Sequence, residues 1–252
     1  MVRYRGGTFA LAALVLGALM LCSVLAGDEV DIRIGTKMER GLIDVGGTAV
    51  SFLGNIDSSP SAAAPGVTRN VLLLHGAKYS AQTWQDLGTL AVLAGAGFRV
   101  AAVDLPTSVM NPPRDELLES ICRGLGMAED APAAIVSPSM SGTFSVPLLL
   151  RKPDLFAAYV PVAPGQALSY TAEAFAAVDV PALIVYGEMD KMGAKASSLL
   201  QAIPESRLLV IPGASHPCYL DEPELFHSRL LSFLRDDAVF SPRERRLSDL
   251  PS

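Results

Sequence analysis

The sequence predicts a single α/β domain with a mostly parallel sheet and helices on both faces. The chain has 252 residues, and half of them are hydrophobic. This is enough for one domain with a sizeable core, but the length is short for two domains. From residue 70 onward, short apolar segments alternate with helical patterns. This alternation is typical of parallel strands joined by helical crossovers.

The expected elements follow one another at regular intervals along the chain. The predicted strands are Asn70–His75, Phe98–Asp104, Ala133–Ser137, Ala158–Val162, Ala182–Tyr186 and Leu208–Ile211. The predicted helices are Ala81–Ala94, Arg114–Gly124, one beginning near Ser141, Thr171–Ala177, Ala194–Ala202 and Glu222–Leu234. Before them, Asp31–Thr36 and Ala49–Leu53 alternate weakly and predict an antiparallel hairpin, and Ser58–Gly66 reads as a loop.

The N-terminus carries a membrane signal. Arg3 and Arg5 precede an uncharged apolar run that ends at Gly27 and is long enough for a spanning helix of about 20 residues. Basic residues before this run keep the N-terminus in the cytosol, which predicts a single-pass type II membrane protein. A cleaved signal peptide and a secreted protein are the alternative. We therefore expect a signal-anchor or transmembrane segment over 1–27, a single α/β domain over 28–235 and a mobile polar tail over 236–252.

Charge and cysteine usage exclude some classes of function. A net charge of −6 disfavours nucleic acid as a partner, because phosphate binding needs clustered Lys and Arg. The three cysteines form no CxxC pair and have no zinc-type spacing, so no metal site is expected. Cys122 and Cys218 read as two separate buried thiols, although an oxidising compartment would allow a bridge between them.

A serine-rich turn follows the third predicted strand. Val136–Gly142 reads VSPSMSG and resembles the G-x-S-x-G turn that presents a nucleophilic serine between a strand and a helix. The residues two before and two after that serine must be small, and Ser137 and Ser141 meet this requirement around Ser139. Taken alone, Ser and Pro at this place usually mean an ordinary turn and helix cap.

A second signal, His75-Gly76, ends the first predicted parallel strand. A glycine there allows the chain to approach a substrate carbonyl. The N–H groups of Ala77 and Met140 would then form an oxyanion hole. His75 itself is expected to be buried and structural.

Two further loops supply an acid and a base. Asp190 lies just beyond the strand Ala182–Tyr186, and His216 follows a glycine turn after the last strand. Glu188 fits a solvent-facing acid, and His227 is expected on the surface of the final helix. The chain order Ser139, Asp190, His216 is that of α/β hydrolases, and each residue follows its own strand, where ligands bind in open sheets. The sequence therefore predicts the α/β-hydrolase fold, with a minimal lid because little chain separates Val162 from Ala182.

Several segments resemble the α/β-hydrolase domain-containing protein 14 family. They are Val71–Gly76, Thr83–Leu90, Val136–Gly142, Tyr159–Pro164, Ala182–Gly187 and Ser215–Leu220. The N-terminal segment resembles that of the membrane-anchored A-type member. The chain departs from the family at Asp104–Met110, where members have a glycine-rich turn.

The resemblance implies the same three catalytic residues and action on small acyl groups. For the cytosolic type it also implies acetyl transfer from acetylated lysine to coenzyme A, but the predicted topology separates this domain from the cytosolic coenzyme pool.

These observations predict a serine hydrolase acting on small acyl esters or amides through a Ser139–His216–Asp190 triad and an acyl-enzyme intermediate. Hydrolysis of this kind implies no cofactor. Two alternatives remain at this point: acyl transfer to a specific acceptor, and a non-catalytic binding module on the same fold.

Overall fold

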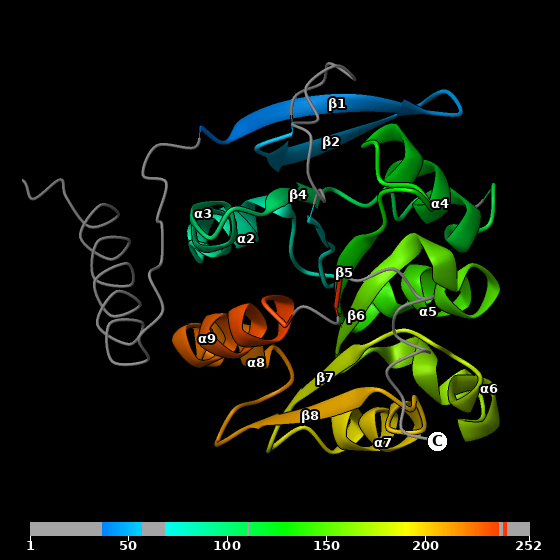
Figure 1. Ribbon diagram of the computed structural model, residues 1–252, viewed down its shortest axis with the longest axis vertical. Coiled ribbons are helices and arrows are strands. Elements are labelled where there is room, and N and C mark those ends of the chain that lie inside the picture. Colours follow the sequence, from blue (N-terminus) through cyan, green and yellow to red (C-terminus); the bar gives the residue numbers. More distant parts are fainter. Residues whose placement is uncertain (1–36, 57–68, 110, 237–238, 241–252) are drawn as a thin grey trace, which may run out of the picture.

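The computed structural model describes residues 37–56, 69–109, 111–236 and 239–240. In this part of the chain an eight-stranded sheet forms the centre of the domain (Figure 1). Its strands are β1 (Glu39–Val45), β2 (Thr48–Gly54), β3 (Asn70–Leu73), β4 (Arg99–Val103), β5 (Ala133–Pro138), β6 (Phe156–Val162), β7 (Ala182–Gly187) and β8 (Ser206–Ile211). The order is β1-β2-β4-β3-β5-β6-β7-β8, with β1 and β2 antiparallel and β3 to β8 parallel.

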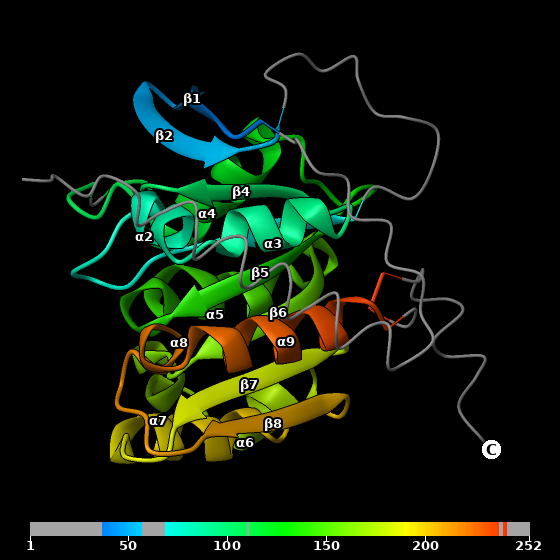
Figure 2. The same cartoon turned by 90° about the vertical axis from the view of Figure 1, so that its left-hand side faces the viewer.

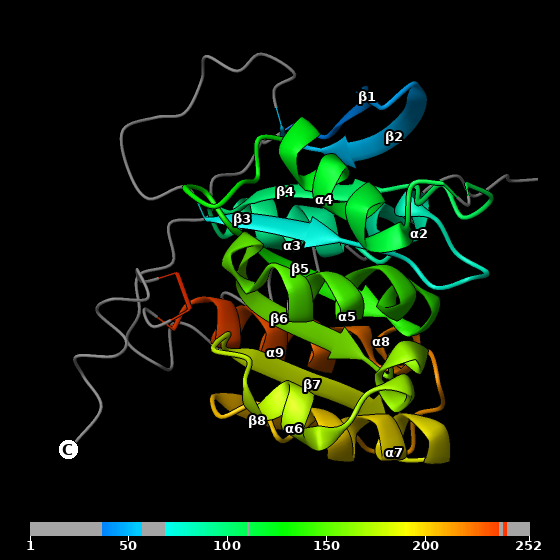
Figure 3. The same ribbon diagram turned by 90° about the vertical axis from the view of Figure 1, so that its right-hand side faces the viewer.

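Helices cover both faces of the sheet, as the sequence predicts. One face carries α2 (Ala81–Asp86), α3 (Thr89–Gly95), α8 (Cys218–Asp221) and α9 (Pro223–Leu234) (Figure 2). The other carries α4 (Arg114–Gly124), α5 (Gly142–Arg151), α6 (Ala172–Ala176) and α7 (Lys191–Leu200) (Figure 3). Short 3-10 turns η1 (Ser139–Ser141), η2 (Pro153–Leu155) and η3 (Gly165–Ser169) complete the connections.

Each face of the sheet has its own hydrophobic core. Along β3, Leu72 belongs to the core under α4 to α7, whereas Val71 and Leu73 belong to the core under α2, α3, α8 and α9. This alternation arises because successive side chains of a strand point to opposite faces. The central strands β3, β5 and β6 are buried throughout, which is why they read as continuous apolar runs.

The predicted helix Ala81–Ala94 is two helices. Gly88 has a φ of +77°, in the left-handed region that glycine enters without a steric penalty, and this turn separates α2 from α3. The leading hairpin is formed by β1 and β2. Its predicted first strand, Asp31–Thr36, lies outside the described residues.

The predicted N-terminal segment 1–27 and the predicted loop Ser58–Gly66 also lie outside the described residues. Within the described ranges, no helix combines the length and apolar character needed to cross a bilayer. Most of the predicted tail 236–252 is likewise outside them. Two of its residues contact the core: Val239 is buried, and the Phe240 ring centroid lies 6.0 Å from that of Phe98.

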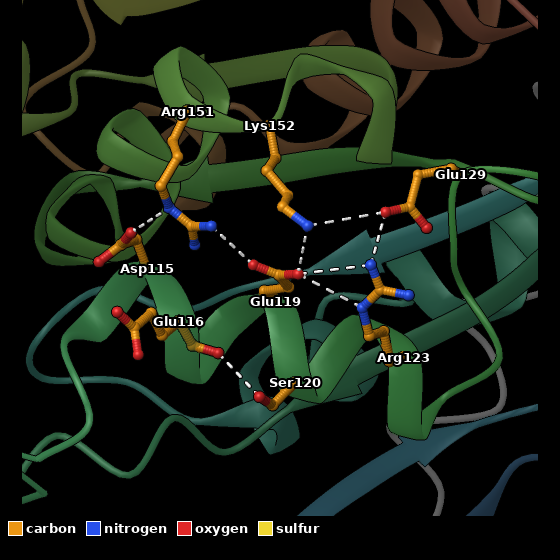
Figure 4. Close-up of polar contacts among 8 residues, drawn as sticks. All are labelled: Asp115, Glu116, Glu119, Ser120, Arg123, Glu129, Arg151 and Lys152. Carbon is orange, nitrogen blue, oxygen red and sulfur yellow. Dashed lines mark hydrogen bonds and ion pairs between the residues drawn. The ribbon is translucent and has the colours of Figure 1, made fainter.

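An ion-pair network fastens α4 to the end of α5 (Figure 4). The Glu119 carboxylate contacts Arg151 Nη1 at 2.8 Å and Lys152 Nζ at 2.9 Å, and Arg123 approaches it at 3.4 Å. The hydrogen bond from Lys152, together with Arg151, lowers the pKa of Glu119 to about 2. The ionised carboxylate therefore stabilises the folded state more than the unfolded one.

Replacing Glu119 with Gln should lower the free energy of unfolding by about 1 kcal/mol at pH 7, because it leaves two cations without their shared carboxylate. The pKa of Glu119 in the folded state lies below the usual value of 4.5. The difference in free energy of unfolding between wild type and Glu119→Gln should therefore be complete above pH 4.5 and shrink as pH falls toward 2. Urea unfolding at pH 7 and pH 3 measures both effects. Glu116→Gln is the control, because Glu116 is exposed on the same helix with its carboxylate apart from the network (Figure 4); equal losses in both variants would contradict the assignment.

Candidate active site

Ser139 lies in a sharp turn between β5 and α5. Its φ is +51°, in the left-handed region that residues other than glycine rarely adopt. The flanking residues Ser137 and Ser141 are fully buried, at 0% exposure, so the turn has room only for small side chains at these positions. This is the geometry of a nucleophile elbow, in which the strained turn projects the serine hydroxyl from the edge of the sheet.

The structure brings the three predicted residues together in one line of hydrogen bonds. His216 Nε2 lies 2.8 Å from Ser139 Oγ, and His216 Nδ1 lies 2.5 Å from Asp190 Oδ2. A carboxylate accepts hydrogen bonds, so Nδ1–H donates to Asp190. That arrangement leaves the Nε2 lone pair facing the serine hydroxyl, which is the tautomer that can accept its proton.

Asp190 is held by the helix that follows it. As the N-cap of α7, its Oδ1 accepts from the N–H groups of Met192 at 3.1 Å and Gly193 at 2.9 Å. Because these amides occupy one oxygen, the other is left to His216. The residue is only 9% exposed, so the carboxylate has little freedom to turn away.

The acid loop and the histidine loop touch at Gly187. A Cβ there would lie 2.1 Å from the Ser215 carbonyl oxygen and 2.5 Å from that of Ala214. Both distances are too short for contact between a Cβ atom and an oxygen. The Met189 N–H donates to the Ala214 carbonyl at 2.9 Å. Glycine at 187 therefore sets the spacing between the two loops that carry the acid and the base.

Two further acids hold the histidine loop. Asp221 Oδ2 accepts from both the N–H and the hydroxyl of Ser215, at 2.7 and 2.6 Å, and these bonds lower the pKa of Asp221. Glu188 is exposed, as predicted, and its Oε2 accepts from the Gly213 N–H at 2.8 Å. Asp221 is a site residue that no sequence motif singled out; its signal is an acid at the end of the short helix α8, which begins two residues after His216.

The predicted oxyanion donors lie on the two segments that meet at the nucleophile. A Cβ on Gly76 would lie 3.8 Å from Ser139 Cβ, so this loop borders the serine. Ala77 follows Gly76 and is exposed, and Met140 follows Ser139 and is half-buried. Their amides are thus carried by the chain segments adjacent to Ser139 Oγ.

The other two histidines are structural. His75 is 7% exposed; its Nε2 accepts from the Leu105 N–H at 2.9 Å, so Nδ1 donates to the Gly76 carbonyl at 2.8 Å. This confirms its predicted buried position. The predicted surface position of His227 is wrong: it is 2% exposed, its Nε2 lies 2.8 Å from Thr89 Oγ1, and burial lowers its pKa to about 4. The face of α9 that carries His227 packs inward, beside α3.

Both described cysteines are free thiols, as predicted. Cys122 and Cys218 are buried, and burial raises the pKa of each thiol to about 12. The described residues contain no cluster of three or more His, Cys, Asp or Glu side chains that could hold a metal ion.

In the part of the chain that the structure describes, only short segments lie between β6 and β7, where a lid would cover the site. Between β6 and β7 the structure has the turn η3 and the five-residue helix α6, which confirms the predicted minimal lid. The His216 side chain is 48% exposed. The hydrogen-bonded line is therefore reachable from solvent.

The strand order, the helix-covered sheet and the serine turn at its carboxyl edge are those of the α/β hydrolases, and the chain is a hydrolase of this class. Among relatives, "Putative protein-lysine deacylase ABHD14B" of Homo sapiens is 39% identical over 207 residues, which cover 79% of this chain and 96% of the relative. "Protein ABHD14A" of Rattus norvegicus is 38% identical over 174 residues, covering 65% of this chain and 71% of the relative. The chain therefore belongs to the ABHD14 family.

The solved structures agree on the fold. A CIB-like hydrolase from Thermoplasma acidophilum superimposes with a TM-score of 0.69 at 23% identity, covering 80% of this chain and 100% of that one. No protein-family model matches the chain. The more specific assignment to the membrane-anchored A-type member stays a prediction from the N-terminal sequence.

Replacing Asp221 with Ala should slow labelling of the enzyme by a fluorophosphonate about 10-fold, because Ser215 loses both hydrogen bonds and His216 loses its fixed backbone. Asp221→Asn keeps one acceptor oxygen and should restore most of the labelling rate. Circular dichroism confirms that both variants are folded. Equal rates in wild type and Asp221→Ala would show that the contact does not orient His216.

Proposed function

We propose that the chain hydrolyses small acyl esters or amides through Ser139, His216 and Asp190. The observation that carries this proposal is the line of hydrogen bonds from Asp190 through His216 to Ser139, at 2.5 and 2.8 Å. A binding module on the same fold has no use for a base oriented toward a serine hydroxyl in a strained turn. The arrangement therefore favours catalysis over binding alone.

In the first half-reaction His216 Nε2 takes the hydroxyl proton while Ser139 Oγ attacks the substrate carbonyl carbon. Asp190 holds the ring in the required tautomer and stabilises the imidazolium as it forms. The proton then passes from His216 to the departing alcohol or amine. The acyl group remains on Ser139 as an ester.

The oxyanion of each tetrahedral intermediate would be stabilised by the N–H groups of Ala77 and Met140. Each such donor typically contributes about 3 kcal/mol of transition-state stabilisation. Their placement on the two segments beside Ser139 supports this role.

In the second half-reaction His216 takes a proton from the acceptor, which attacks the acyl-serine. Water as acceptor gives the free acid and regenerates Ser139. An acceptor thiol such as that of coenzyme A would instead give acyl transfer, and the residues described in the site do not discriminate between these acceptors.

Acylated lysine is the amide substrate that the family relationship favours, since a relative 39% identical carries the name of a protein-lysine deacylase. The thin lid and the exposed His216 ring also suit a substrate presented on a long side chain of another protein. We therefore include N-acyl-lysine in the proposed substrate class.

Fluorophosphonate labelling of the full chain tests the proposal. Wild type should become labelled on Ser139, and Ser139→Ala should lose the label and at least about 10⁴-fold in the rate of ester hydrolysis. Ser120→Ala, an exposed serine on α4, is the matched control and should label normally. A folded wild-type chain that stays unlabelled would overturn the proposal in favour of the binding module.

A peptide bearing N-acetyl-lysine tests the amide substrate. Wild type should release acetate from it, and Ser139→Ala should not, because both cleavages use the same acyl-serine. Adding coenzyme A and measuring acetyl-coenzyme A separates transfer from hydrolysis. Ester turnover without any cleavage of the peptide would restrict the substrate class to esters.

A further inference from the structure

Four buried hydroxyl groups form a connected chain beneath the nucleophile turn. They belong to Ser137 on β5, Ser141 on η1, Ser145 on α5 and Tyr159 on β6, and all four residues are 0% exposed. Successive oxygens are 2.9 Å apart for Tyr159–Ser145, 2.6 Å for Ser145–Ser137 and 3.0 Å for Ser137–Ser141. The chain ends where Ser141 Oγ donates to the Pro138 carbonyl at 2.8 Å.

The direction of this chain follows from counting hydrogens. A carbonyl oxygen only accepts, so the single hydroxyl hydrogen of Ser141 is committed to Pro138. Ser137 must then donate to Ser141, Ser145 to Ser137, and Tyr159 to Ser145. Burial raises the pKa of Tyr159, so its phenol keeps the proton with which the chain begins. Every hydroxyl hydrogen in the series is thereby used.

The small size of the turn residues does not explain these hydroxyls. Glycine is the usual residue two before and two after the nucleophile, and it brings no polar group into the core. Here Ser137 and Ser141 place two hydroxyls there, and two more from neighbouring elements satisfy them. Burying a polar group without a partner has a free-energy cost, so each of these hydroxyls needs the next one as a hydrogen-bond partner.

The series of hydroxyl groups ends at the peptide bond between Pro138 and Ser139. The Pro138 carbonyl and the Ser139 N–H share one rigid plane, and the orientation of this plane helps determine the left-handed backbone of Ser139, with its φ of +51°. A hydrogen bond to the carbonyl therefore constrains the residue that projects the reactive hydroxyl.

We propose that the hydroxyl chain Tyr159–Ser145–Ser137–Ser141 positions Ser139 by holding the Pro138 carbonyl in place. The inference rests on the proposed role of Ser139 as nucleophile. The four residues act through the backbone and are positioning residues. Because Tyr159 lies on β6 and Ser145 on α5, they tie the turn to both neighbouring elements.

The effect of each substitution should decline with its distance along the chain from Pro138. We expect kcat for hydrolysis of p-nitrophenyl acetate to fall about 30-fold in Ser141→Ala, about 10-fold in Ser137→Ala and about 3-fold in Tyr159→Phe. Ser141→Ala removes the hydrogen bond to the Pro138 carbonyl. The other two substitutions leave that bond in place but weaken it, because they remove donors that polarise it from further along the series. KM should stay within about 2-fold of wild type, since substrate binding uses other groups. Tyr159→Phe keeps the ring and removes only the hydroxyl, so it separates the chain from packing of the core.

A double-mutant cycle tests whether Tyr159 acts through Ser137. If it does, adding Tyr159→Phe to Ser137→Ala should lower kcat no further, whereas independent effects would multiply to about 30-fold. Ser197→Ala is the matched control, because Ser197 is a fully buried serine whose hydroxyl has no hydrogen-bond partner among the described residues. It should keep the wild-type kcat.

The outcomes separate this inference from the proposed function. Wild type that reacts with fluorophosphonate while all three variants keep its kcat would overturn the hydroxyl chain and leave the hydrolase intact. Multiplicative losses in the cycle, or an equal loss in Ser197→Ala, would likewise overturn it. A folded wild type that neither labels nor turns over ester would overturn the proposed function and, with it, this inference.

Discussion

The left-handed backbone of Ser139 is the constraint on which the rest of the site depends. A residue other than glycine in that conformation costs about 1–3 kcal/mol, so the surrounding structure must over-determine it. A typical hydrogen bond contributes about 1 kcal/mol net, and one bond alone would not hold the turn. The turn accordingly follows β5, which is fully buried between β3 and β6, and the buried Ser141–Pro138 bond reinforces it.

Helix α5 transmits this constraint because it is held at both ends. At its start it continues directly from the serine turn, and the Arg114 guanidinium on α4 donates to Thr143 Oγ1 at 2.8 Å. At its end Arg151 and Lys152 are bound by Glu119 of the same α4. The ion-pair network lies at the opposite end of α5 from the nucleophile, so it supports stability without placing strong charges beside the reacting groups.

The acid and the base are held by different means. Asp190 is bound by two amides at the start of α7 and is nearly buried, whereas His216 has an exposed ring on a loop. The loop is made rigid through its backbone: Asp221 binds Ser215, Glu188 binds Gly213, and Gly187 allows the two loops into contact. An open site can thus keep an oriented base, because the hydrogen bonds that hold the loop backbone orient the His216 ring without a covering lid.

The sequence by itself determined the α/β class and the thin lid, because these depend on local features: strand periodicity and the length between two strands. It also predicted which three side chains meet in hydrogen bonds, because Ser139, Asp190 and His216 each follow the carboxyl end of a predicted parallel strand; their catalytic roles stay a prediction. The tertiary structure decided what depends on which elements pack together. The buried side of α9 at His227 was mispredicted because its partner, Thr89, is far away in sequence. The Asp221–Ser215 contact and the Tyr159–Ser145 link could not be read from spacing, since they exist only once a loop folds onto α8 and β6 pairs beside β5. Hydrogen bonds between buried groups need angstrom-scale placement, and that placement comes from packing rather than from the order of residues.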